Sequence, residues 1–208
     1  MKKLLLILLA LCSLNAKAAG GISDFFGDTR ADEVFKSLTS VARLDMLDYY
    51  KSGMTNPTNT EFGSFARITA LEDSVLVLDC GMGVSCELVL LPSKKPVLML
   101  IETLPLPEKD SRIRFFDSKW NEIANPPLAE ITLDDWLTDE GRSLRGNVED
   151  VIPFMLSTAK YEPKSQKLVI TSNIASYFAG EKPSQLSLLK PELTFVWNGK
   201  AFKPVREK

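Results

Sequence analysis

The sequence predicts an α+β fold: an antiparallel β meander with an N-terminal packing helix, followed by a second, degenerate half of helix and strands. Three patterns support this. A helical period covers residues 32–51, apolar runs with short Gly- and Pro-containing links extend over 62–123, and a second group of strand-like runs occupies 154–205. Consecutive strands joined by short links pair antiparallel by default. Thr132 is expected to cap a helical turn at 132–137, and Asn198-Gly199 predicts a hairpin turn.

Residues 1–18 have the pattern of a signal peptide. Lys2 and Lys3 precede the apolar run 4–11, and small residues at Ala16 and Ala18 predict cleavage before Ala19. The run is shorter than the roughly 20 residues of a membrane span. A lipoprotein at Cys12 is the alternative, but Leu11 stands where lipid attachment requires a small residue.

The remaining residues, 19–208, are expected to form one α+β domain in the periplasm or outside the cell. A proline-containing stretch, 124–131, is a candidate boundary between its two halves. Loss of Lys2, Lys3 and Lys17 with the leader leaves 22 basic against 27 acidic residues, a net charge of −5. This charge argues against a nucleic-acid partner.

The chain contains no histidine. Catalysis by Ser-His-Asp or Cys-His groups and metal binding by histidine are therefore excluded. Glycine-rich phosphate loops and nucleophile-elbow motifs are also absent, so we expect neither a cofactor nor a metal site. Any catalysis would have to use carboxylates, lysine, tyrosine or serine.

The apolar residues of 32–51 recur at three- and four-residue steps, which predicts one amphipathic helix with Val34, Leu38, Val41, Leu44 and Leu47 on its buried face. Asp45 and Asp48 lie three residues apart on the same predicted helix. Two close carboxylates suit cation binding or acid–base chemistry. A solvated face with Arg43 as counter-charge is the simpler interpretation.

Residues 74–92 read as a hairpin with a cysteine on each side of its turn. If Cys80 and Cys86 lie directly opposite, the register pairs Leu78 with Leu88 and places a continuous apolar row on the cysteine face. We expect a disulfide there, worth about 2 kcal/mol. A redox pair is disfavoured because the spacing is not the CxxC of disulfide oxidoreductases.

The same register places Asp79 opposite Glu87. Like charges across a strand pair are unfavourable, so the two carboxylates either separate into solvent or share a cation such as calcium. Separation into solvent is the favoured interpretation.

Two further features are candidates for a functional site. Trp120, Trp136 and Trp197, with Phe115 and Phe116, suit stacking on sugars, although aromatic residues on strands are more often core. Residues 138–150 are polar and glycine-spaced, which marks them as the best candidate for a mobile functional loop.

Several short motifs in a fixed order resemble an uncharacterised family of exported proteins from Gram-negative gut anaerobes, domain of unknown function three-two-five-six. They are RLDMLDYYKSGM at 43–54, TALED at 69–73, LLP at 90–92, FFDSKW at 115–120, LKPEL at 189–193 and WNGK at 197–200 with Phe202. The resemblance spans most of the mature chain and implies no activity or catalytic residue. The cysteine pair departs from the family's usual hairpin, which favours a local stabilising role.

Together these features favour an exported, non-enzymatic envelope or binding module whose partner is an envelope protein or a glycan. The alternative is a carboxylate-based hydrolase that acts on glycans or peptides. Such an enzyme requires two acidic residues roughly 5 to 10 Å apart in a cleft.

Overall fold

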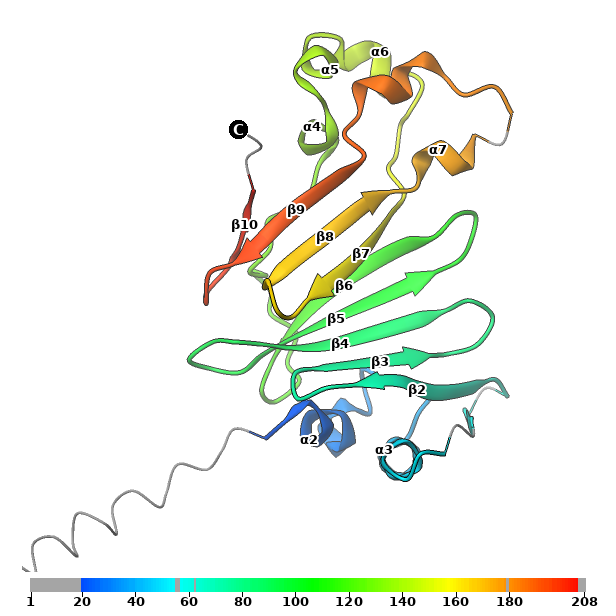
Figure 1. The fold of residues 1–208 in the computed structure, drawn as a ribbon, viewed down its shortest axis with the longest axis vertical. Coiled ribbons are helices and arrows are strands. Elements are labelled where there is room, and N and C mark those ends of the chain that lie inside the picture. The colour runs from blue at the N-terminus through cyan, green and yellow to red at the C-terminus, as the bar shows by residue number, and fades with distance from the viewer. Residues whose placement is uncertain (1–19, 55–56, 62, 179, 206–208) are drawn as a thin grey trace, which may run out of the picture.

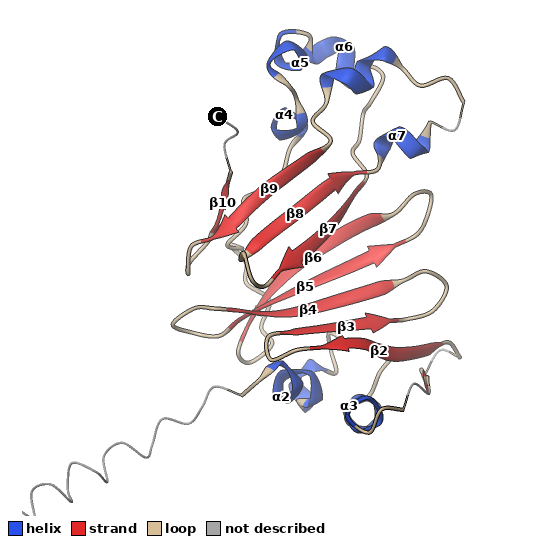
Figure 2. Ribbon diagram, viewed as in Figure 1, coloured by secondary structure: helices blue, strands red, loops and turns tan. Residues whose placement is uncertain are grey.

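The computed structural model describes residues 20–54, 57–61, 63–178 and 180–205 (Figure 1). The predicted signal peptide lies outside these ranges. Two antiparallel sheets carry short helices at both ends of the molecule (Figure 2), so the predicted α+β class is confirmed. Within these ranges, no helix is long and apolar enough to cross a bilayer.

The first sheet is a six-stranded meander in which each strand pairs with the next along the chain. Its strands are β1 (Thr58–Asn59), β2 (Phe65–Leu71), β3 (Val75–Asp79), β4 (Ser85–Leu91), β5 (Val97–Leu104) and β6 (Asp110–Asp117). Short connections make this order the simplest antiparallel topology.

The second sheet has four strands in the order β10-β9-β8-β7. They are β7 (Ser157–Glu162), β8 (Lys167–Ser172), β9 (Glu192–Trp197) and β10 (Phe202–Pro204). Asn198-Gly199 forms the predicted turn between β9 and β10, with Gly199 at a φ of 88°. β7 is the edge strand that lies beside the first sheet (Figure 1).

Both faces of the first sheet are buried, which explains the continuous apolar runs in β3, β4 and β5. One face, which includes Leu76, Leu88 and Leu98, packs against the N-terminal helices α2 (Ile22–Gly27) and α3 (Ser40–Lys51). The other face, which includes Val89 and Met99, shares a core with the second sheet.

This shared core is closed at its far end by short helices between and after the strands of the second half (Figure 1). They are α4 (Leu133–Trp136), α5 (Asp139–Ser143), α6 (Arg145–Glu149), α7 (Ile174–Tyr177) and the 3-10 helix η2 (Ser184–Leu188). Thr132 and Asp135 form a capping box at the start of α4, as its sequence predicts.

The N-terminal helix is shorter than its period predicts. Thr39 caps it through a bond from the Ala42 amide, and a 3-10 turn, η1 (Thr29–Ala31), precedes it. The helix therefore starts at Ser40, and Val41 and Leu44 of the predicted buried face are 67% and 50% exposed.

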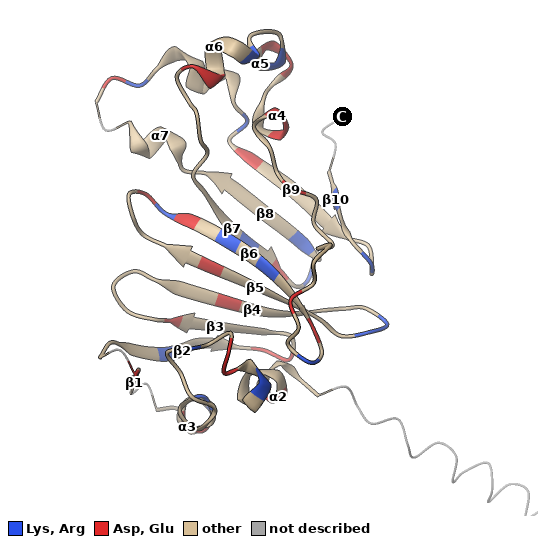
Figure 3. Cartoon of the chain, turned by 180° about the vertical axis from the view of Figure 1, so that it is seen from behind, with Lys and Arg blue, Asp and Glu red and all other residues tan. Residues whose placement is uncertain are grey.

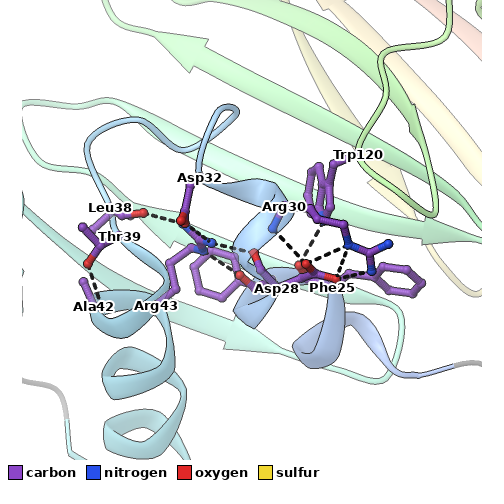
Figure 4. A network of polar contacts seen from close by, with 10 residues as sticks. Phe25, Asp28, Arg30, Asp32, Leu38, Thr39, Ala42, Arg43 and Trp120 are labelled. Atoms are coloured by element: carbon purple, nitrogen blue, oxygen red, sulfur yellow. Dashed lines mark hydrogen bonds and ion pairs between the residues drawn. The ribbon is translucent and has the colours of Figure 1, made fainter.

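Arg43 explains this change of helical face. Its buried guanidinium donates to the carbonyl oxygens of Phe26 (2.6 Å), Leu38 and Asp28 (2.8 Å) and to the Asp32 carboxylate at 2.8 Å (Figure 4). A charged group with this many acceptors organises the segment before α3. Arg43 is therefore not the counter-charge of Asp45 and Asp48, and that prediction was wrong.

The hairpin of β3 and β4 has a register two residues away from the expected one. Leu78 lies opposite Cys86, Leu76 opposite Leu88, and Val77 opposite Glu87. The connection spans 80–84, where Gly81, Met82 and Gly83 all have positive φ. A two-residue shift keeps every side chain on its face, so the apolar cysteine face was predicted correctly although its pairs were not.

Candidate functional site

The second sheet is anchored to the first through the free edge of β7. Amides of alternate residues donate to side chains of the first sheet: Ser157 N to Asp110 Oδ1 (3.0 Å), Ala159 N to Ser111 Oγ (3.0 Å) and Tyr161 N to Glu87 Oε1 (3.2 Å). Alternate amides of a strand point to the same edge, and β8 occupies the opposite edge. These bonds satisfy an edge that would otherwise pair with another strand.

A cleft of about 420 Å³ lies beside this anchored edge. The first sheet contributes Val77, Glu87, Ile101 and Thr103, and the second contributes Thr158, Lys160, Glu162, Val169 and Thr171, with Ala159 between them. The residues of β7 and β8 that alternate with these belong to the shared core, so the cleft is on the opposite side of the second sheet. Ser85 and Cys86 at the start of β4 and the loop residues Gly83 and Lys109 complete its lining.

Glu87 is the least solvated acid of this cleft. Burial raises its pKa to about 7, while the bond from Tyr161 N and the charge of Lys160 act in the opposite direction. Burial penalises the charged carboxylate because the protein replaces water around it. The carboxyl therefore titrates near neutral pH, a range in which an ordinary glutamate is fully ionised.

The other charged residues of the cleft are Lys109, Lys160 and Glu162. Residues of both signs occur along β4 to β7 when the molecule is seen from behind (Figure 3). Among the described residues, no ion pair within 4.0 Å joins Glu87 to a lysine or arginine. Lys160 therefore affects Glu87 through its field and not through a salt bridge.

The structure separates the predicted carboxylate pair of Asp79 and Glu87. Asp79 lies opposite Ser85, binds Arg67 at 3.0 Å and accepts the Gly81 amide at 2.9 Å. The expected cross-strand pairing was wrong because the register differs by two residues. Within the part of the chain that the structure describes, no three Cys, Asp or Glu residues form a cluster suited to a metal ion.

Asp45 and Asp48 are exposed on α3. That helix covers the face of the first sheet opposite the cleft. These two acids therefore cannot contribute to chemistry in the cleft.

Cys80 and Cys86 are free thiols in the structure, with their Sγ atoms 3.8 Å apart. A disulfide requires an S–S distance of about 2.05 Å, so the structure shows two thiols in contact, and the bridge stays a prediction. Contact with Cys80 and burial raise the pKa of the Cys86 thiol. The two cysteines are neighbours, as predicted, but across the hairpin end and not as a directly opposite pair.

The aromatic residues proposed for sugar stacking are core residues. Trp120, Trp136, Trp197, Phe115 and Phe116 are all less than 7% exposed. The indole N–H of Trp197 donates to the Pro92 carbonyl at 2.8 Å, and that of Trp120 to the Phe25 carbonyl. The described lining of the cleft contains no aromatic residue, which removes the usual platform for a sugar ring.

The polar stretch 138–150 is mostly helical and largely exposed, with Gly141 and Val148 buried, which differs from the predicted loop. It forms α5 and α6, with Val148 fully buried. Gly141 lies so close to the Leu188 carbonyl that an added Cβ would be 2.4 Å from its oxygen. No residue of this stretch lines the cleft.

Sequence reasoning identified Glu87 but not the residues around it. The alternation of Thr158, Lys160 and Glu162 with Ala159 and Tyr161 indicates a strand with one polar side. The alternation alone does not predict that this polar side lines a cleft with the first sheet. The position of the first sheet depends on the contacts along the edge of β7, which are long-range.

The family model described as "Protein of unknown function (DUF3256)" matches residues 16–202. The chain belongs to this family. The resemblance inferred from the short motifs is thereby confirmed, although no function comes with it. No curated protein is significantly similar to the chain.

A solved structure, described as a domain of an uncharacterized protein from Porphyromonas gingivalis W83, has the same fold. It aligns with a TM-score of 0.73 at 17% sequence identity and covers 90% of this chain and 100% of that chain. At this identity the similarity concerns the fold alone.

The raised pKa of Glu87 predicts a pH-dependent stability. In the unfolded chain Glu87 ionises near its usual 4.5, and in the folded protein near 7. The folded state therefore binds the proton more tightly, and stability is lost as pH rises from about 4.5 to about 7. The free energy of unfolding of the Glu87→Gln variant, relative to that of the wild type, should change by up to about 3 kcal/mol across this window, because each pKa unit corresponds to about 1.4 kcal/mol.

Urea unfolding at pH 4, 5.5, 7 and 8 measures this difference. Glu162→Gln, at the exposed acid of the same cleft, is the matched control for the loss of one carboxylate from the lining. If the free energies of unfolding of Glu87→Gln and the wild type differ by the same amount from pH 4 to 8, Glu87 is not desolvated.

Proposed function

We propose that the protein is an exported, non-enzymatic binding module that holds its ligand in the cleft between the two sheets. The observation that carries this proposal is the partly buried Glu87 carboxyl in a cleft of about 420 Å³ with apolar and hydroxyl-bearing walls. Ligand sites of soluble proteins combine this size, a mostly apolar lining and a few placed polar groups.

Two exposed apolar residues at loop tips lie near the cleft and could contact the same partner. Met82 is 89% and Leu106 is 80% exposed. They flank Gly83 and Pro105, which nearly touch: a Cβ on Gly83 would be 3.2 Å from the Pro105 ring. Gly83 also lines the cleft. Neighbouring apolar tips of this kind favour contact with a partner larger than a free small molecule.

The carboxylate-based hydrolase remains the second candidate, because Glu87 and Glu162 line the same cleft and a raised pKa suits a general acid. We favour binding because one oxygen of Glu87 already accepts the Tyr161 amide. This bond holds the carboxyl as a fixed acceptor.

Filling the cleft tests the proposal. Small organic fragments that bind the protein should shift the amide signals of Val77, Ile101 and Val169 in ¹H–¹⁵N NMR spectra. The Thr171→Trp variant should abolish these shifts because the indole would occupy the cleft. Lys203→Trp, at an exposed position on β10 away from the cleft, is the control and should leave them intact. Fragment shifts that persist in Thr171→Trp, or that cluster elsewhere, would contradict a ligand site in the cleft.

A Cys80–Cys86 disulfide belongs to the same proposal of export. In an oxidising compartment, a disulfide oxidant accepts two electrons and two protons from the thiols as the S–S bond forms. The exported protein should show no thiol reactive with Ellman's reagent until it is reduced and unfolded, and two afterwards. The same chain made in a reducing cytosol is the control, with both thiols free. Two free thiols in the exported protein would contradict the bridge.

A further inference from the structure

We infer that the cleft recognises a primary ammonium group on a short alkyl chain, with the Glu87 carboxylate as its partner. This inference rests on the proposed binding function and specifies its ligand class. The chemistry occurs in the lysine side chain of a peptide and in free aliphatic diamines.

The first argument is the unmet charge of Glu87. Its one hydrogen bond among the described residues comes from the Tyr161 amide, and no cation lies within 4.0 Å. An ionised carboxylate without a paired cation is costly in a partly buried site. A ligand ammonium would supply the missing positive charge and a charge-assisted hydrogen bond.

The second argument is the composition of the walls. Val77 and Ile101 of the first sheet and Val169 of the second line the cleft, so both sheets contribute apolar surface to it. These surfaces suit the methylene groups of an alkyl chain. Thr103 and Thr171 also line the cleft. The Thr103 hydroxyl already pairs with the Ser111 hydroxyl at 2.8 Å, and a hydroxyl oxygen has two acceptor sites, so both threonines can accept an ammonium N–H.

The third argument concerns the protein's own cations. Lys109 and Lys160 line the cleft but form no ion pair with Glu87, and Glu162 adds a second negative charge. These three are the other charged groups of the lining, so they set the electrostatic background against which a ligand binds. The two lysines and two glutamates give the lining no net formal charge. Lys109, Lys160 and Glu162 are exposed to solvent, whereas burial desolvates Glu87, so the preference for a cationic ligand rests on Glu87.

Calorimetric titration with matched probes tests the inference. Nα-acetyl-lysine methylamide and cadaverine carry the alkylammonium group, and Nα-acetyl-norleucine methylamide has a similar chain without it. At pH 8 we expect both amines to bind more tightly than the norleucine probe. The tighter of the two amines identifies the peptide or the free diamine as the source. Affinity for both should weaken as pH falls below about 7, where Glu87 becomes protonated.

The Glu87→Gln variant should weaken amine binding at least about tenfold, the effect of losing one charge-assisted hydrogen bond. Glu162→Gln is the matched control and should change the dissociation constant much less. An equal or larger effect of Glu162→Gln would overturn the assignment of Glu87, and so would unchanged amine binding in Glu87→Gln.

The two proposals fail in different ways. If the norleucine probe binds as tightly as the amines and Thr171→Trp blocks both, the cleft is a ligand site but the ammonium inference is wrong. If none of the three probes binds with a dependence on Thr171, the amine inference is also wrong, and the fragment screen then decides whether the cleft binds any ligand.

Discussion

The arrangement of the two sheets depends on the hydrogen bonds made by the amides at the edge of β7 that does not pair with β8. A strand edge leaves alternate amides without partners, and buried amides without acceptors cost about 1 to 3 kcal/mol each. In this protein the acceptors are side chains, from Asp110, Ser111 and Glu87 of the first sheet. The second sheet therefore meets the first by its edge and does not extend it as a seventh strand. This arrangement leaves a shared core on one side of the second sheet and the cleft on the other.

Glu87 links this structural constraint to the proposed function. Its position on β4 lets one oxygen accept the Tyr161 amide while the carboxyl remains in the lining of the cleft. Hydrophobic neighbours on both sheets desolvate the group, and its pKa rises as a result. Glu87 joins the two sheets and forms no ion pair among the described residues, so its carboxyl is available to a ligand that enters the cleft.

Much of the fold followed from local sequence patterns. The apolar runs of β3 to β5, the capping residue Thr132 and the turn at Asn198-Gly199 depend on neighbouring residues only, and each was predicted. The errors arose where long-range contacts decide. The start of α3 depends on Arg43 reaching Phe26, 17 residues earlier in the chain. The hairpin register is a different case: it depends on the local backbone of Gly81, Met82 and Gly83, whose positive φ values lengthen the turn beyond the expected one.

The site was less predictable because its contacts are long-range. Glu87 was identified from an expected cross-strand pair with Asp79 that does not exist. Its actual partners come from β7, more than 70 residues later in the chain. No local pattern marks Lys160 or Thr171 as neighbours of Glu87, because the meeting of the two sheets is a property of the whole chain.

Hydrogen exchange of the β7 amides tests the central claim most directly. The amides of Ser157, Ala159 and Tyr161 should be protected to a degree similar to those of Thr158 and Lys160, which face β8. Removing one acceptor with Ser111→Ala should accelerate exchange at Ala159 more than at its neighbours. Free exchange at the three edge amides in the wild type, with Thr158 and Lys160 still protected, would show that side chains of the first sheet do not hold the second.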